Sequence, residues 1–157
     1  MDFLILLAFA TRPPAGAVRK PGPSMRGTLD SMAMTPQPIG VKAAPPQNDT
    51  YSQAVRMGDL IYLSGQLGVR PDGSVPETFG EQVRQALDNV AVVLEAAGSS
   101  LSLVAKVNIY ITDFSLLREM NEIYPKYFPH KPAKTTVEIS RLDKGAQIEV
   151  EVVAAAG

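Results

Sequence analysis

The sequence predicts an α+β two-layer sandwich, a mixed sheet with two helices on one face. Residues 79–97 carry apolar side chains at spacings of three and four, which indicates a helix of about five turns with one buried stripe. Residues 105–112 alternate apolar and polar side chains, as in a strand with one buried face. The predicted elements follow in the order β-β-α-β-α-β-β, and such runs give a sheet whose helices gather on one face.

The first two strands form a hairpin ahead of the long helix. Residues 52–57 and 60–64 are its strands, and the Gly-Asp pair at 58–59 is a two-residue turn in which glycine takes a positive φ. The Pro-Asp-Gly run at 71–73 is a further turn. Gly98 follows the apolar stripe of the helix and ends it as a C-terminal cap.

The C-terminal half supplies a second helix and two more strands. This helix starts at Asp113 or Ser115 and ends at or soon after Pro125. The strands span residues 135–141 and 147–153, and their inward side chains are Val137, Ile139, Ile148, Val150 and Val152. The sheet face without helices is either solvated or covered by other subunits, and the second outcome predicts an oligomer.

The composition bounds the class of protein. The chain has 157 residues, about one domain, and it has no cysteine, which excludes disulfides and thiolate chemistry. His130 is the only histidine, so a His-rich metal site is impossible, and its position after the second helix favours an exposed loop side chain. The net charge is −1 and no basic run is present, which argues against nucleic acid as a partner.

The first fifty residues differ from the rest, because they hold eight of the 13 prolines and show no sustained period. Proline-rich polar sequence buries too little surface to offset its ordering entropy. We therefore expect residues 1–47 to be a disordered leader and residues 48–157 to be the domain. The apolar run at 3–10 is too short to cross a bilayer, which needs about 20 residues. Asp2 precedes it where a signal peptide carries basic residues.

Two interpretations of this leader stay open. Four basic residues between positions 12 and 26 suggest an organelle transit peptide. Three methionines between positions 25 and 34 instead allow translation to start later, with the leader as upstream sequence. The expected location is the cytoplasm, or the mitochondrion if the leader is a transit peptide, and no membrane association is expected.

Five segments of the chain resemble the Rid/YjgF family in order and spacing, over about residues 48–155. They are YSQAV (51–55), IYLSGQLGV (61–69), EQVRQALDNVAVVLEAAG (81–98), MNEIYPKYFP (120–129) and TVEISRLDKGAQIEVEVVA (136–154). The resemblance implies a chorismate-mutase-like fold, assembly as a homotrimer and active sites in clefts between subunits. It also implies hydrolysis of reactive 2-imino and enamine acids to 2-keto acids and ammonia, with no metal or organic cofactor.

The resemblance also assigns residues to the site. Tyr51 matches a tyrosine at the site mouth, and Asn121 matches an asparagine on the second helix. Ser64 and Gly65 match the family's SGQ turn, whose hydroxyl and backbone N–H groups can point at one atom.

Glu149 matches the family's glutamate that orients or activates a water molecule. It shares the polar face of the last strand with Glu151, because residues two apart in a strand point the same way. If both carboxylates were buried there, the pKa of one should rise, which suits a general acid or base. A solvated strand face or an ion pair between subunits is the alternative.

Three positions depart from the family pattern. Lys134 stands where the deaminases carry an arginine that forks onto the substrate carboxylate, and lysine keeps the charge but loses the two-point grip. Thr136 stands where many members have a cysteine, and Asp143 where many have a proline. Both positions line the family's pocket, so the substrate or the reaction could differ.

Three functions are compatible with these residues. The first is hydrolytic deamination of 2-imino acids, with Glu149, Lys134 and Ser64 in catalytic roles and a substrate-binding set of Tyr51, Gly65, Asn121, Thr136 and Asp143. The second is action on another imine, enamine or carbonyl intermediate by a diverged relative. The third is a non-enzymatic trimer that binds small acids or another protein.

Overall fold

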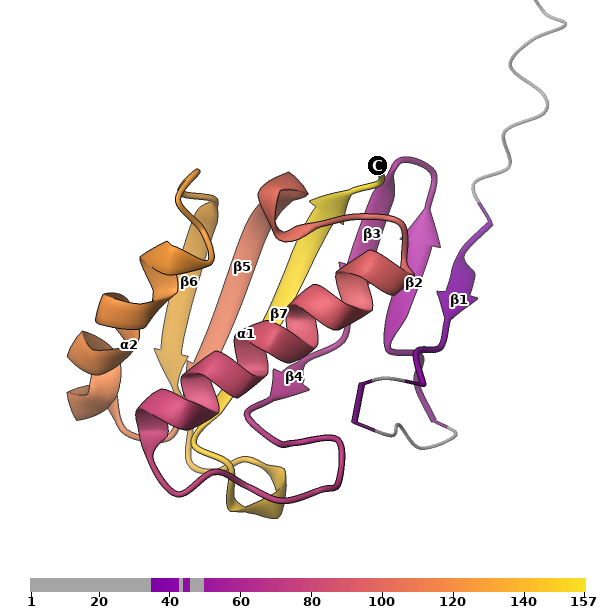
Figure 1. Ribbon diagram of the computed structural model, residues 1–157. Helices are drawn as coiled ribbons and strands as arrows, with labels where there is room; N and C mark the ends of the chain where they lie inside the picture. Colours follow the sequence, from indigo (N-terminus) through magenta and orange to yellow (C-terminus); the bar gives the residue numbers. More distant parts are fainter. Residues whose placement is uncertain (1–34, 43, 46–49) are drawn as a thin grey trace, which may run out of the picture. The chain divides into compact units, whose positions relative to one another are not determined.

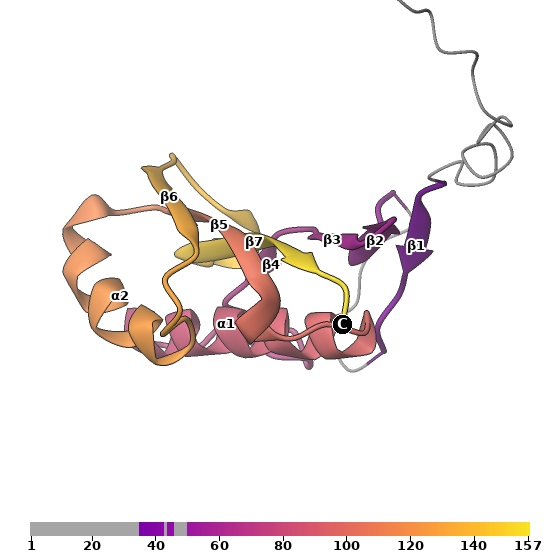
Figure 2. The same ribbon diagram turned by 90° about the horizontal axis from the view of Figure 1, so that it is seen from above.

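The computed structural model describes residues 35–42, 44–45 and 50–157. These residues form one mixed sheet of seven strands in the order β1-β2-β3-β7-β5-β6, with β4 paired to β7. Both α-helices cover the same face of the sheet (Figures 1 and 2), which confirms the predicted α+β sandwich. The strands are β1 (Gln37–Ile39), β2 (Ala54–Met57), β3 (Leu60–Leu63), β4 (Gln66–Leu67), β5 (Val104–Ile111), β6 (Ala133–Glu138) and β7 (Ile148–Ala155).

Two α-helices and four short 3₁₀ helices complete the described part of the chain. The α-helices are α1 (Phe79–Ala96) and α2 (Leu117–Ile123). The 3₁₀ helices are η2 (Leu101–Leu103), η3 (Phe114–Leu116), η4 (Tyr124–Lys126) and η5 (Asp143–Gly145). The predicted second helix is therefore α2 with a 3₁₀ turn at each end, and Asp113 caps the first of these by accepting the Ser115 N–H at 2.8 Å.

The hairpin of β2 and β3 has the predicted turn. Met57 pairs with Leu60 across it, and Gly58 takes a φ of 61°. Strand β1 pairs with the outer edge of β2, although it lies inside the segment expected to be a leader. The sheet thus begins before residue 48, and the rest of the expected leader lies mostly outside the described residues.

Gln53 holds the segment that follows β1 against the sheet. This side chain is buried, donates to the Pro45 carbonyl at 2.9 Å and accepts the backbone N–H of Val41. Buried polar groups need such partners. A strand of three residues that contains Pro38 shows no period, and proline is tolerated because β1 is an edge strand.

Helix α1 has a defined start and end. Thr78 and Glu81 form a capping box, in which each side chain accepts a backbone N–H of the other residue. Gly98, with a φ of 76°, follows the last turn, and the Ser99 N–H donates to the Leu94 carbonyl at 2.9 Å. This is a Schellman cap, and it confirms the predicted end at Gly98.

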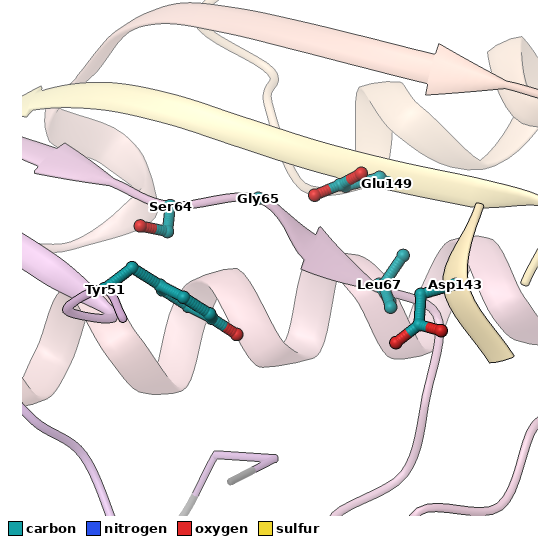
Figure 3. Close-up of a pocket in the computed structure, with 6 residues that line it drawn as sticks. All are labelled: Tyr51, Ser64, Gly65, Leu67, Asp143 and Glu149. Atoms are coloured by element: carbon teal, nitrogen blue, oxygen red, sulfur yellow. The ribbon is translucent and has the colours of Figure 1, made fainter. Parts of the chain in front are cut away.

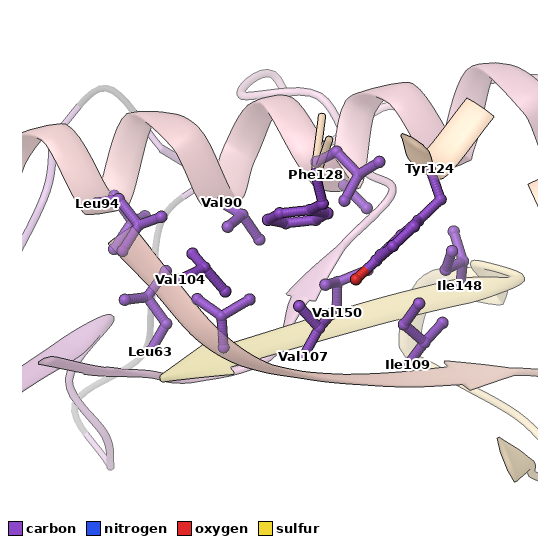
Figure 4. Close-up of a cluster of buried hydrophobic side chains, with 14 of the residues drawn as sticks. Leu63, Val90, Leu94, Val104, Val107, Ile109, Tyr124, Phe128, Ile148 and Val150 are labelled. Carbon is purple, nitrogen blue, oxygen red and sulfur yellow. The ribbon is translucent and has the colours of Figure 1, made fainter. Parts of the chain in front are cut away.

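The apolar stripe of α1 packs on the central strands and forms the core (Figure 4). Val90 and Leu94 are fully buried, and Leu94 lies on the side of the cluster that holds Val104 and Leu63. Phe128, which follows η4, fills the space between the two layers and is 1% exposed. The apolar residues of β7 at positions 148, 150 and 152 are buried, as predicted.

Strand β6 differs from its prediction. It runs parallel to β5, and Thr136 pairs with the buried Ile109, so Thr136 faces the helix layer. Val137 pairs with Tyr110 on the opposite face and is 40% exposed, so the inward placement of Val137 is wrong. Ile139, also expected inward on this strand, lies beyond its end and is half-buried. The cause is that β6 is an edge strand, where apolar alternation does not report which face is covered.

The face of the sheet opposite the helices is open in the single chain. It carries the exposed side chains of Leu60 and Tyr62 on β3 and of Val137 on β6. It also carries the carboxylates of Glu149 and Glu151 on β7, because the alternate residues of that strand are buried against α1. We call this surface the open face. Along residues 35–42, 44–45 and 50–157, no helix has the length and apolar character needed to cross a membrane.

Candidate active site

A pocket of about 380 Å³ lies on the open face where β3 gives way to β4 (Figure 3). Leu67 of β4 pairs with Glu149 of β7, so both side chains point to the same side of the sheet. The pocket is lined by Tyr51, Ser64, Gly65, Leu67, Asp143 and Glu149. Five of these six were singled out from the sequence, and Leu67 was not, because nothing distinguishes it from an ordinary strand leucine.

The Ser64-Gly65 turn is fixed by hydrogen bonds to the segment that carries Tyr51. The Ser64 N–H donates to the Gln53 carbonyl at 3.0 Å, and the Ser64 hydroxyl donates to the Ser52 carbonyl at 2.7 Å. Because its proton is used in this hydrogen bond, the Ser64 hydroxyl can act toward a ligand as a hydrogen-bond acceptor. Tyr51, 48% exposed, lies at the mouth of the pocket.

Gly65 allows the Glu149 carboxylate to lie directly against this turn. A Cβ added at Gly65 would overlap the Oε1, Cδ and Cγ atoms of Glu149. Glycine is therefore required for a close approach of side chain to backbone. Burial raises the pKa of the half-buried Glu149 above its usual value, and the negative charge of Glu151 raises it further.

Asp143 brings a second carboxylate to the pocket from the 3₁₀ helix η5. Its Oδ1 accepts the N–H of Lys144 at 2.9 Å, and Lys144 takes a φ of 56°. This hydrogen bond holds the exposed Asp143 side chain in the loop that leads to β7. The lining of this pocket thus has two carboxylates and no cation within the described residues.

The three remaining predicted residues lie together on the helix side of β6. The Lys134 ammonium donates to the Asn121 side-chain oxygen at 2.9 Å and lies 4.7 Å from the centre of the Tyr124 ring. Partial burial lowers the pKa of Lys134. Thr136 follows Lys134 on the same strand face, since residues two apart point the same way.

Two hydroxyl groups beside Lys134 are buried without a hydrogen-bond partner among the described residues. They are the Tyr124 hydroxyl and the Thr136 Oγ1. Burial raises the pKa of Tyr124 to about 12, so this phenol is a neutral donor at physiological pH. The N-x-x-Y spacing from Asn121 brings Tyr124 to this cluster, which was the only sequence signal for it.

Within one chain the sheet separates Lys134 from Glu149. Lys134 points to the helix side at the β6 edge, and Glu149 points to the open face two strands away. The predicted residues therefore fall into two groups, which Leu67 and Tyr124 complete. We call them the carboxylate pocket (Tyr51, Ser64, Gly65, Leu67, Asp143 and Glu149) and the lysine cluster (Asn121, Tyr124, Lys134 and Thr136).

Neither His130 nor an acidic group adds a metal site to the described residues. His130 lies outside both groups, with its Nε2 2.9 Å from the Val104 carbonyl. No group of three or more His, Asp or Glu side chains has the geometry to hold a metal ion in the described part of the chain.

The fold and the pocket together define a class of protein. It is an α+β sandwich with one uncovered sheet face and a small polar pocket beside a half-buried carboxylate, and proteins with these features are known. A family model described as Endoribonuclease L-PSP matches residues 41–156. A RutC family protein of Aquifex aeolicus is 44% identical over 120 residues, 74% of this chain and 96% of the relative. The mitochondrial protein mmf2 of Schizosaccharomyces pombe is 45% identical over 109 residues, 67% of this chain and 86% of the relative.

Solved structures agree with this match. The YyfA protein of the conserved Rid family from Yersinia pestis superposes with a TM-score of 0.75 at 38% identity, over 78% of this chain and all of that chain. The Escherichia coli YjgF gene product has a TM-score of 0.72 at 35% identity, over 76% and 98%. E. coli TdcF with bound serine has a TM-score of 0.73 at 31% identity, over 77% and 99%. The chain belongs to the Endoribonuclease L-PSP family, the family of the Rid and YjgF proteins.

Proposed function

We propose that this protein hydrolyses reactive 2-imino acids, and their enamine tautomers, to 2-keto acids and ammonia. The observation that carries the proposal is the Glu149 carboxylate, which lies half-buried against the Ser64-Gly65 turn with a raised pKa. A carboxylate with a raised pKa holds a proton more readily than an exposed one, which suits it to take and return a proton during a reaction. The pocket of about 380 Å³ suits a small acid and a water molecule.

The proposed site is completed by a second copy of the chain. The carboxylate pocket has no cation within the described residues, whereas the lysine cluster at the β6 edge has one. The open face carries apolar side chains that a neighbouring copy would cover. We therefore assign the substrate carboxylate to Lys134 of a neighbouring subunit in a homotrimer. Asn121 would orient the ammonium through the hydrogen bond that it accepts.

The catalytic help that the reaction needs from the protein is proton transfer. Water adds to C2 of the imine while one of its protons passes through Glu149 to the nitrogen, which gives a carbinolamine. The hydroxyl proton then follows the same route, the C–N bond breaks with its electron pair on nitrogen, and ammonia leaves as the C=O bond forms. The Ser64 hydroxyl, which donates to Ser52, accepts a hydrogen bond from the water or the imine N–H.

Binding of a small acid without turnover is the second candidate. It is favoured by the bound serine of TdcF and by lysine at position 134, which grips a carboxylate at one point only. Cleavage of RNA, which the family description suggests, is less compatible with the site. Its two carboxylates would repel the phosphates that dominate RNA binding.

A mitochondrial location is compatible with the transit-peptide interpretation of the leader. The relative mmf2 is a mitochondrial protein by name. A fluorescent fusion of the full chain that enters mitochondria, and fails to do so without residues 1–34, would support this location over the cytoplasm.

A coupled imine assay tests the proposed function. An amino-acid oxidase generates 2-imino acids from several amino acids, and semicarbazide traps the imine that remains. We expect wild type to speed imine loss and Glu149→Ala to abolish the effect, with exposed Glu95→Ala as the matched control. Lys134→Ala should lose most activity, Lys134→Arg should retain or raise it, and Lys126→Ala should change nothing. No acceleration by wild type on any imine, together with binding of small acids, would favour the second candidate.

A further inference from the structure

A second carboxylate on the open face is held by two side chains of β5. The Asn108 Nδ2 donates to the Glu151 Oε1 at 2.7 Å, and the Tyr110 hydroxyl donates to the same oxygen at 3.1 Å. Asn108 lies directly opposite Glu151 in the sheet, whereas Tyr110 lies opposite Glu149 and reaches Glu151 along the diagonal. None of these three residues lines the carboxylate pocket.

The two carboxylates differ in their hydrogen bonds. Glu151 accepts two, and no side chain or backbone group among the described residues donates to the carboxylate of Glu149. Hydrogen bonds to an ionised carboxylate favour the ionised form. Glu149 and Glu151 point to the same side of β7, roughly 7 Å apart along the strand by its rise per residue. Glu151 is therefore a carboxylate held in place by two hydrogen bonds, and its negative charge acts on Glu149.

We propose that Glu151, fixed by Asn108 and Tyr110, is a positioning residue whose negative charge favours the protonated form of Glu149. The inference deepens the proposed function, since it explains how Glu149 is ready to give and take a proton. The direction of the Glu149 pKa agrees with this role, because burial raises that pKa and the charge of Glu151 raises it further. Burial, the hydrogen bond to Glu151 and the charges of both glutamates also raise the pKa of Tyr110, so this phenol stays a donor.

Other charged or titratable groups face the pair from neighbouring elements. Asp143 and Tyr51 line the pocket around Glu149, and Tyr62 lies on the open face of β3. Lys106 is on the same face of β5 as Asn108, but its ammonium donates to the Thr135 hydroxyl. Of these groups and Glu151, Glu151 is the one whose charge raises the pKa of Glu149.

Carboxyl NMR of the full-length protein tests the proposal without any substrate. Glutamate is labelled with ¹³C at the side-chain carboxyl, and Glu149→Gln assigns the Glu149 signal. We expect Glu151→Gln to move the Glu149 titration to lower pH, and the conservative variant Tyr110→Phe to move it in the same direction. Glu95→Gln, far along α1 and exposed, should leave it unchanged. An unmoved Glu149 midpoint in folded Glu151→Gln and Tyr110→Phe proteins would overturn the proposal.

The pH profile of imine hydrolysis separates this inference from the proposed function. If both hold, the limb of the kcat/KM profile that reports Glu149 moves to lower pH in Glu151→Gln by the same amount as the NMR midpoint. A moved midpoint in a protein that hydrolyses no imine would support the positioning role and refute the deaminase. Imine hydrolysis with an unmoved midpoint would support the deaminase and refute the positioning role of Glu151.

Discussion

At the scale of single residues, Gly65 determines how closely Glu149 approaches the turn between β3 and β4. Gly65→Ala would push the carboxylate away from its position, and a displacement near 1 Å can cost about 10²-fold in rate. We expect imine hydrolysis to fall by about that factor while the fold is retained. Gly40→Ala is the matched control, because nothing lies within 4 Å of a Cβ at that position. Equal activity of the two variants would show that the Glu149 position is unimportant.

The raised pKa of Glu149 also makes a prediction about stability. A group whose pKa is raised by folding stabilises the protein fully below its usual value of 4.5, and this contribution is lost as pH rises through the folded value. Glu149→Gln removes that loss, since it cannot ionise. We expect Glu149→Gln to melt above wild type at pH 7, and the difference to vanish near pH 4. A variant that melts below wild type at pH 7 would contradict the burial of this carboxylate.

Single residues also show how far the sequence predicts the site. The resemblance brought together Tyr51, Ser64, Gly65, Asp143 and Glu149, which line one pocket. It grouped Lys134 with them, although the sheet places Lys134 on the other side within one chain. In a central strand, the alternation of apolar and polar residues in the sequence shows which face of the sheet each side chain occupies. An edge strand and a contact between subunits leave no such alternation in the sequence.

At the scale of elements, α1 is the part of the fold that the sequence predicts most completely, because its period, N-cap and C-cap all agree. Strands β1 and β4 were missed because three and two residues are too short for a period. Leu94→Ala tests the role of the α1 stripe. Deleting a fully buried leucine costs about 2–5 kcal/mol in the free energy of unfolding.

The neighbouring Glu95→Ala is exposed and should change stability by less than about 0.5 kcal/mol. Urea unfolding of both variants measures the difference. Similar midpoints for the two would mean that the α1 stripe does not form the main core.

At the scale of the whole molecule, one chain carries a carboxylate pocket without a cation and a lysine cluster without a carboxylate, within its described residues. The open face adds Leu60, Tyr62 and Val137, each at least 40% exposed. These features are explained together if copies of the chain cover each other's open face and share three sites. The central claim is thus that Glu149 and Lys134 of one site come from different subunits.

Mixed assembly of two inactive variants tests this claim most directly. Glu149→Ala and Lys134→Ala chains are unfolded together, refolded at equal amounts and assayed for imine hydrolysis against each variant refolded alone. If each site joins two subunits, random assembly leaves about one site in four with both side chains, so about a quarter of wild-type activity should return. Activity no higher than that of either variant alone would contradict the shared site.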